Sequence, residues 1–213
     1  RVAGGAIAKK YLKEHSKVNI FGYVSRIGEH EANKINYKDI EKNPFFFPDK
    51  KMVPILENYI NKIRKSGDSI GAEVTVIAKN VPAGLGNPVF DKLDALLASS
   101  MMSINAVKGV EIGSGFDVIS KKGSECRDEI TPKGFKTNHA GGALGGISTG
   151  QDIVVKMALK PTSSILIPGE TITTKNKKTT IATKGRHDPC VGIRATPIAE
   201  AMMALVLCDL LLR

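Results

Sequence analysis

The C-terminal segment 199–212 limits the possible folds of this chain more than any other stretch. Apolar side chains occur nearly all the way round it, among them Met202, Met203, Leu205 and Val206. A helix that is apolar on every side has to be buried, and this segment is too short to cross a membrane. We therefore expect a helix packed between other layers, with Thr196 as its N-cap and Pro197 as its first helical residue.

Upstream of that helix, the sequence contains patterns of both kinds of secondary structure. Helices are predicted over 2–15, over 50–65 with Asp49 as a cap, and from Pro88 or Val89 onward. Strands are predicted over 18–27, 70–81, 107–112, 153–155, 170–174 and 179–183. The charged segment 121–137 is interpreted as a mobile loop. Since the elements do not alternate in strict βαβ order, the predicted fold class is α+β with antiparallel sheet.

The length of 213 residues is enough for one domain with its own core, and no linker or repeat divides it. We therefore interpret residues 1–213 as a single domain. The cysteines Cys126, Cys190 and Cys208 are odd in number and lack the spacing of metal ligands. They are interpreted as free thiols in a reducing compartment, with no metal site. No signal-peptide pattern is present, so a cytoplasmic protein is expected.

The charge of the chain favours an anionic partner. It carries 31 basic and 21 acidic residues, a formal net charge of +10. Nucleic acid is one candidate, but the chain has no Trp, few aromatic residues and no basic helix with interleaved aromatics. A small ligand with several negative charges explains the excess at least as well.

The segment 138–164 has the features of a ligand-binding stretch. It opens with a glycine run that allows close approach of the backbone, continues through the apolar residues 153–155, and ends in KPTSS. Lys160 and the hydroxyls of Thr162, Ser163 and Ser164 can hold a phosphate or a polar heterocycle. A mobile loop followed by an ordinary strand is an equally weighted alternative for this stretch taken alone.

A second polar cluster occupies 185–194, with the sequence GRHDPCVGIR. Arg186 and Arg194 carry planar guanidinium groups suited to phosphate and carboxylate. His187 and Asp188 are candidates for proton transfer. The alternative is a surface turn with a local salt bridge.

Together these strings resemble the chorismate synthase family. The resemblance rests on NHAGGALGGISTGQ, MALKPTSSI and GRHDPCVGIRATPIAEAM, with MSINAVKGVEIG at 102–113 and GDSIGAEVTVIAKNVPAGLGNPVF at 67–90. It extends over the whole chain and depends on several long, unusual strings, so it is highly specific.

The resemblance implies a β-α-β sandwich, in which helices are packed between two antiparallel sheets, and a homotetramer. It also implies a lyase at the last step of the shikimate pathway. Phosphate leaves 5-enolpyruvylshikimate 3-phosphate and a ring proton is lost, a 1,4-elimination that gives chorismate. Reduced FMN is required although there is no net redox change, and NADPH enters only indirectly, as a source of reducing equivalents. No nucleic acid and no membrane take part.

The same resemblance assigns roles to individual residues. Flavin contacts are assigned to Asn105, Ala106, Gly145, Lys160, Pro161, Thr162, Ser163, Ser164 and Arg186. Arg194 is assigned to the substrate, and Asp188 to proton transfer near the flavin. The structural alternatives are a salt bridge to Arg186 or a helix-cap contact for Asp188, and a helix C-cap for Asn105.

Two features depart from the family. Its two main catalytic histidine motifs are absent, so we expect His139 to hydrogen-bond within its loop and His187 to shape the arginine turn. Arg1 has the pattern of the middle of a helix, without an initiator Met or an N-cap, and we expect a chain truncated at its N-terminus. The alternatives are therefore an inactive flavin- or phosphate-binding fragment, or a basic nucleic-acid-binding protein.

Overall fold

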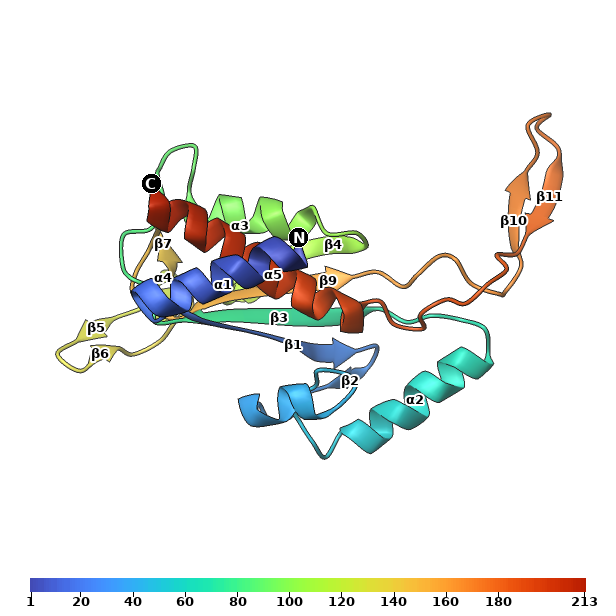
Figure 1. Cartoon of the computed structure of the whole chain (residues 1–213), viewed down its shortest axis with the longest axis horizontal. Helices are drawn as coiled ribbons and strands as arrows, with labels where there is room; N and C mark the ends of the chain where they lie inside the picture. The colour runs from blue at the N-terminus through green and yellow to red at the C-terminus, as the bar shows by residue number, and fades with distance from the viewer.

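The computed structural model describes all 213 residues and contains one large antiparallel sheet (Figure 1). Its five strands lie in the order β2-β1-β3-β9-β4. Their bounds are β1 Asn19–Ile27, β2 His30–Glu31, β3 Ala72–Lys79, β4 Val107–Ile112 and β9 Ile153–Leu159. β9 lies between β3 and β4 and runs antiparallel to both. The end of β9 therefore lies beside the beginnings of β3 and β4.

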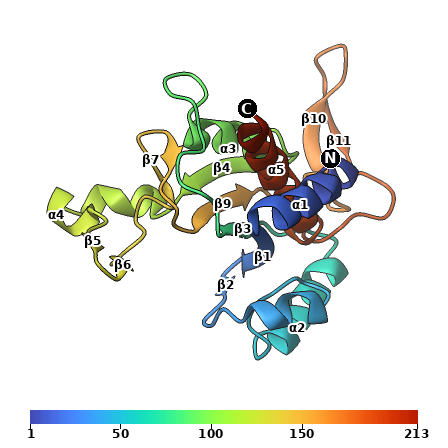
Figure 2. The same ribbon diagram turned by 60° about the vertical axis from the view of Figure 1, so that its left-hand side comes forward.

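Three helices, α1 (Val2–Ser16), α3 (Leu93–Met102) and α5 (Gly192–Leu212), form a layer on one face of this sheet (Figures 1 and 2). The main hydrophobic core lies between that layer and the strands. The α+β prediction is confirmed. In the β-α-β sandwich that the resemblance implies, helices lie between two large sheets. The 213 residues form one large sheet and the helical layer that covers it. The other strands make three two-stranded ribbons.

Helix α5 packs closely on its neighbours because small residues lie at the contacts. A Cβ on Gly5 of α1 would lie 2.3 Å from the Cβ of Ala201. A Cβ on Gly22 of β1 would lie 2.7 Å from Cγ of Glu200 and 3.2 Å from Cγ2 of Thr196. Any larger side chain at these two glycines would push the helix away from α1 or from the sheet.

The carboxylate of Glu200 links the three elements that meet there. One oxygen accepts a hydrogen bond from the backbone N–H of Gly22 at 2.6 Å, and the other pairs with Lys9 Nζ at 2.5 Å. The side chain of Glu200 is 22% exposed. A half-buried carboxylate needs such partners, so this contact fixes α1 and β1 against α5.

The prediction that the last helix begins at Pro197 is wrong, because α5 starts at Gly192. Thr196 is buried inside the helix, where its hydroxyl donates back to the carbonyl of Gly192 at 3.2 Å, so it is no N-cap. Pro197 lies within the first turns and leaves the Ile193 carbonyl without its intrahelical partner. At 21 residues, α5 is also long and apolar enough to cross a membrane by length and composition, with 44% of its apolar window buried. Core helices meet the same criterion.

The opposite face of the sheet carries a smaller cluster. Tyr23 and Ile77 pack there with Ile40 of η1 (Tyr37–Lys42). Burial, followed by the charge of Tyr37, raises the pKa of Tyr23 to about 12. Helix α2 (Val53–Lys65) lies beyond the β1–β2 edge of the sheet and buries Leu56 and Ile60 in the main core (Figure 1).

Several predicted boundaries need correction. α2 begins at Val53 rather than directly after Asp49, whose carboxylate accepts from the N–H of Lys51 at 3.0 Å. α3 begins at Leu93, since the residues from Pro88 to Lys92 form a turn. The segment 121–137, predicted as a loop, contains α4 (Gly123–Cys126), β5 (Ile130–Thr131) and β6 (Gly134–Phe135). The residues before it form the short 3-10 helix η2 (Gly115–Ser120).

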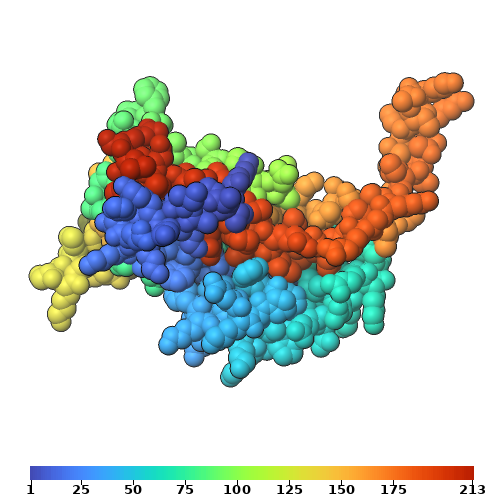
Figure 3. Space-filling view, in the orientation of Figure 1, coloured from blue at the N-terminus to red at the C-terminus, as the bar shows by residue number.

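The predicted hairpin is confirmed as β10 (Gly169–Ile172) and β11 (Lys178–Ile181). It stands out from the body as an arm on which every residue of the two strands is exposed (Figures 1 and 3). Its two connections run from the end of β9 and into the start of α5, so the arm grows out of the region between these elements.

Two adjacent glycines of α1 test the contact with α5. Gly5→Ala should lower the free energy of unfolding by about 1–3 kcal/mol, because the new methyl group meets Ala201. Gly4→Ala is the matched control: its Cβ has only Leu205 Cδ2 nearby, at 3.8 Å. It should be neutral or stabilising by up to about 1 kcal/mol. Urea unfolding measures both, and equal effects would contradict the close contact.

Candidate functional site

A cleft of about 580 Å³ lies where three segments meet beside the end of β9. They are the turn after α2, the chain that follows β9, and the segment before α5 (Figure 1). The polar residues that line it are Arg64, Asp68, Ser69, Arg186, His187, Asp188 and Arg194. The structure therefore brings Arg186, Asp188 and Arg194 together, as the sequence analysis requires.

Asp188 and Arg194 form a two-point ion pair in this cleft. Arg194 Nε donates to Asp188 Oδ2 at 2.6 Å, and Nη2 donates to Oδ1 at 3.2 Å. The hydrogen bonds and then the charge of the carboxylate raise the pKa of Arg194 above its ordinary value. The salt-bridge alternative for Asp188 is thus realised with Arg194 rather than with Arg186. The pair fixes a guanidinium in the first turn of α5.

Arg186 and His187, which lie between Gly185 and Asp188, differ in their polar contacts. Arg186 is exposed, lines the cleft and has no carboxylate within ion-pair distance. His187 is half-buried, and its Nε2 is buried without a hydrogen-bond partner. The segment thus presents one free guanidinium to the cleft and holds one unsatisfied ring nitrogen beneath it.

The segment before α5 is anchored to the sheet. The carbonyl of Pro189 accepts from the N–H of Ile70 at 2.8 Å, just before β3 begins. Cys190 is buried, which raises the pKa of its thiol, although the N–H groups of Gly192 and Ile193 oppose that shift. α5 begins two residues after Cys190, so its first turn, with Arg194, lies at the cleft.

The residues of KPTSS lie next to the cleft without lining it. The N–H of Lys160 donates to the carbonyl of Ala106 at 2.9 Å, and Ser69 Oγ donates to the carbonyl of Thr162 at 2.6 Å. Lys160, Pro161 and Ser163 are exposed. These bonds join the end of β9 to the turn before β4 and to the turn before β3.

Asn105 and Ala106 lie in that turn between α3 and β4. Ser103 is the C-cap of α3, so the C-cap alternative for Asn105 is wrong. Asn105 is exposed, and Ala106 has a left-handed backbone, with φ of 71°. The main chain at Ala106 is therefore held in a strained shape beside Lys160.

Gly145 lies elsewhere, in the turn between β7 (Ala143–Leu144) and β8 (Ile147–Ser148). Its neighbour Gly146 accepts from the N–H of Leu93 at the start of α3, whereas Asn105 follows the end of α3. Ten helical residues span about 15 Å. Gly145 has φ of 63° and no atom near the position of a Cβ, so its backbone is open to a ligand, but not in the same cleft.

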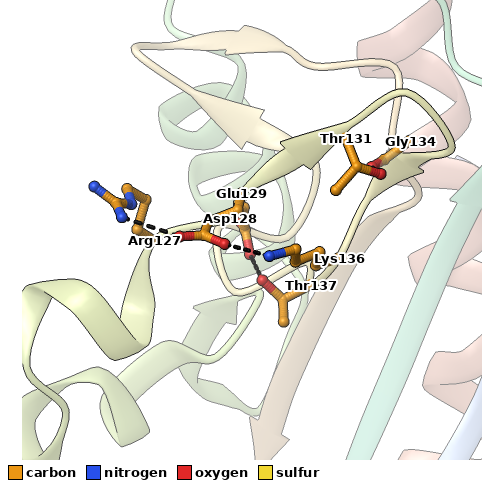
Figure 4. Close-up of polar contacts among 7 residues, drawn as sticks. All are labelled: Arg127, Asp128, Glu129, Thr131, Gly134, Lys136 and Thr137. Atoms are coloured by element: carbon orange, nitrogen blue, oxygen red, sulfur yellow. Dashed lines mark hydrogen bonds and ion pairs between the residues drawn. The ribbon is translucent and has the colours of Figure 1, made fainter.

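The loop before the glycine run is held by Asp128. Its carboxylate accepts from the N–H groups of His139 at 2.7 Å and Ala140 at 2.9 Å, and from the Thr137 hydroxyl at 2.6 Å. Figure 4 shows the contact with Thr137 and the neighbouring pairs of Glu129 with Arg127 and Lys136. The predicted loop 121–137 is therefore tied to the body by hydrogen bonds.

The expected role of His139 is confirmed. Its Nδ1 lies 2.9 Å from Ser114 Oγ and 3.2 Å from Lys121 Nζ, so it hydrogen-bonds within the loops. Among the 213 residues, no three His, Cys, Asp or Glu side chains gather in a way that could hold a metal ion. The thiols of Cys126, Cys190 and Cys208 are unpaired.

Comparison with known proteins decides the family. The family model described as "Chorismate synthase" matches residues 1–212. The chain belongs to the chorismate synthase family. A solved structure titled "Crystal Structure of Chorismate Synthase" is 32% identical to it and has a TM-score of 0.81. That match covers 99% of this chain and 61% of the other, so the chain spans about three fifths of the length of that chorismate synthase.

Three residues of the cleft of this chorismate synthase family member were not singled out from the sequence. They are Arg64, Asp68 and Ser69. Asp68 and Ser69 lie inside the string GDSIG, which was used only to recognise the family. Arg64 follows the apolar pattern of α2, where a basic residue in the last turn has an ordinary explanation in the helix dipole. Only the position of the turn beside the cleft distinguishes it.

Asp128 should make the loop that it holds sensitive to acid. Burial acts to raise the pKa of Asp128, but the bonds from Ala140, Thr137 and His139 outweigh it and hold the pKa below the ordinary 3.8. A lowered carboxyl pKa stabilises above the ordinary value, and the contribution is lost as pH falls through the lowered one. The protection factors for hydrogen exchange at His139 and Ala140, which correct for the pH dependence of intrinsic exchange, should therefore be high at neutral pH and fall only below about pH 4.

Two variants check the same point at neutral pH. Asp128→Asn should accelerate exchange at His139 and Ala140, because the charged acceptor of their N–H groups is lost. Glu129→Gln is the control, since the carboxylate of Glu129 contacts only the side chains of Arg127 and Lys136. Equal exchange in the two variants would show that Asp128 does not hold the loop.

Proposed function

We propose that the protein containing this chain catalyses the chorismate synthase reaction. Phosphate leaves 5-enolpyruvylshikimate 3-phosphate and a ring proton is lost, giving chorismate without net redox change. Family membership supports this lyase activity. The observation that links this activity to particular residues is the cleft lined by Arg186, Asp188 and Arg194. Because the chain spans 61% of the related enzyme, the proposal concerns the whole protein.

The residues around the cleft fit a phosphate-bearing flavin. Arg186 has no carboxylate partner, the Ser163 hydroxyl is exposed, and His187 Nε2 is an unsatisfied polar atom. We propose that FMN is held by Asn105, Ala106, Lys160, Pro161, Thr162, Ser163, Ser164 and Arg186. Reduced FMN, when bound, would supply the electron-rich ring on which the elimination depends. The positive charge of Arg186 favours the anionic reduced form.

Gly145 is proposed as a flavin contact on the family motif alone. It lies by the start of α3, while the other proposed contacts cluster beyond its end and around the cleft. Its open backbone can accept a flat ligand. Contact with the same flavin requires that the ligand, or a second copy of the chain, extend between the two places.

We assign Arg194 to an anionic group of the substrate and Asp188 to proton transfer. The ion pair uses Nε and Nη2 of Arg194, so Nη1 stays available to a ligand oxyanion. Asp188 has an oxygen at the cleft surface that can take up the proton lost from the ring. Held by Arg194, its carboxylate keeps one orientation, which general base catalysis requires.

The remaining elements of the proposal follow from the family. The protein acts as a homotetramer in the cytoplasm, and NADPH contributes only by reducing the flavin. The positive net charge of +10 is assigned to the anionic substrate and cofactor rather than to nucleic acid.

The function is tested with the complete protein. Phosphate release from 5-enolpyruvylshikimate 3-phosphate should occur when FMN is reduced under anaerobic conditions. With oxidised FMN and no reductant, release should stop, because only the reduced flavin supports the elimination. Turnover under the second condition would contradict the proposal.

Asp188→Asn separates a proton-transfer role from a bracing role. Asn keeps the size and part of the hydrogen bonding to Arg194 but cannot take up a proton near neutral pH. The single-turnover rate should fall by about 10²–10⁴-fold while substrate affinity holds. Arg194→Lys is the comparison: it loses the planar guanidinium that pairs with Asp188 and presents Nη1 to the ligand, so it should weaken substrate affinity. A near-normal rate with poor binding in Asp188→Asn would make Asp188 structural.

A further inference from the structure

We propose that Arg64 is a further specificity-determining residue of the cleft, which binds an oxyanion of the substrate together with Arg194. The inference deepens the proposed function and rests on it. It rests on the position of Arg64 in the cleft and on its lack of a carboxylate partner. The sequence motifs described above do not include this residue.

The position of Arg64 is fixed by the end of α2. Ser66 Oγ donates to the carbonyl of Ile63 at 2.8 Å, and the N–H of Gly67 donates to the carbonyl of Arg64 at 3.1 Å. Gly67 is left-handed, with φ of 72°, and this reverses the chain. Its carbonyl then accepts from the N–H of Leu166 at 3.0 Å, which ties the turn to the chain after β9. The last turn of α2 thus forms one wall of the cleft.

Arg64 stands beside the ion pair of Asp188 and Arg194. It lines the cleft of about 580 Å³ and also an adjoining hollow of about 500 Å³, and both hollows contain Asp188 and Arg194. Arg64 is therefore among the residues that the two spaces share. A ligand in either space that contacts Arg194 also has Arg64 in the wall around it.

The guanidinium of Arg64 is free to bind an anion. It has no carboxylate within ion-pair distance, and its one side-chain contact is a long 3.5 Å bond from Nη1 to Asn61 Oδ1. Arg194, in contrast, already has Nε and Nη2 occupied by Asp188. An oxyanion at the rim would meet the two-point fork of Arg64 and the remaining Nη1 of Arg194. It would not need to break the pair with Asp188.

A role in the helix dipole does not account for this placement. Basic residues in the last turn of a helix are stabilising, and α2 has Lys62 and Lys65 there as well as Arg64. Neither lysine lines the two hollows. The two lysines therefore supply the stabilising positive charge at the end of α2 without Arg64. Lys65 is a matched control for a change of charge on the same turn.

The experiment uses the full-length protein with reduced FMN. Arg64→Gln should raise KM for 5-enolpyruvylshikimate 3-phosphate by about tenfold and leave kcat within about twofold, as expected when ground-state binding is lost. Lys65→Gln should leave both constants unchanged. Arg64→Lys keeps the charge and the helix but loses the planar fork, so its KM should lie between those of the wild type and Arg64→Gln. A KM in Arg64→Gln equal to that in Lys65→Gln overturns the inference.

Two substrate fragments identify the recognised group and keep the inference separate from the function. Shikimate carries a carboxylate, and shikimate 3-phosphate adds a phosphate. If Arg64→Gln weakens only the phosphate-bearing fragment, Arg64 binds phosphate, and if it weakens both equally, Arg64 binds carboxylate. Unchanged affinity for both fragments with a raised KM assigns Arg64 to the enolpyruvyl carboxylate, which neither fragment carries. Unchanged affinity for both with a KM equal to that of Lys65→Gln overturns the inference. This binding is measured without turnover, so absence of activity in the wild type would overturn the proposed function but not Arg64.

Discussion

Burial of α5 is the constraint on which the other elements depend. Apolar side chains project from every side of this helix. They are removed from water by packing against β1 and β3 on one side and against α1 and α3 on the others. Each large side chain that is fully buried contributes roughly 1.5–3 kcal/mol. Glycine and alanine at the contacts let the backbones approach, and Glu200 adds a charged contact, to Lys9 and to the backbone of β1.

The same helix places the cleft. Its first turn follows Cys190 directly, so Arg194 leaves the helix close to the sheet, and the bond between Pro189 and Ile70 holds the preceding segment beside β3. Asp188 completes this arrangement by fixing the guanidinium of Arg194. The Asp188–Arg194 pair, to which roles are proposed above, is thus built on the end of a buried helix, which gives it a rigid base.

The register of β9 explains why distant segments meet there. Leu159 at its end pairs with Ala72 at the start of β3 and with Val107 at the start of β4. The turn after α2 and the turn after α3 are therefore neighbours of Lys160, although they are about 90 and 55 residues away in sequence. Gly145 precedes the beginning of β9 and for that reason lies by the start of α3.

Local patterns in the sequence determined the main strands, the projecting hairpin, the α+β class and the family. These features depend on apolar spacing and on long motifs, which are properties of short stretches. Tertiary structure decided where α5 begins, because Thr196 and Pro197 match the pattern of a helix start, yet the helix extends to Gly192, which packs closely against Ala72 of β3. It decided too that Asp188 pairs with Arg194 and that Arg64 lies at the cleft. The Asp188–Arg194 pair depends on where α5 begins, since Arg194 lies in its first turn. The place of Arg64 beside the chain after β9 depends on strand register, and no local pattern contains that register.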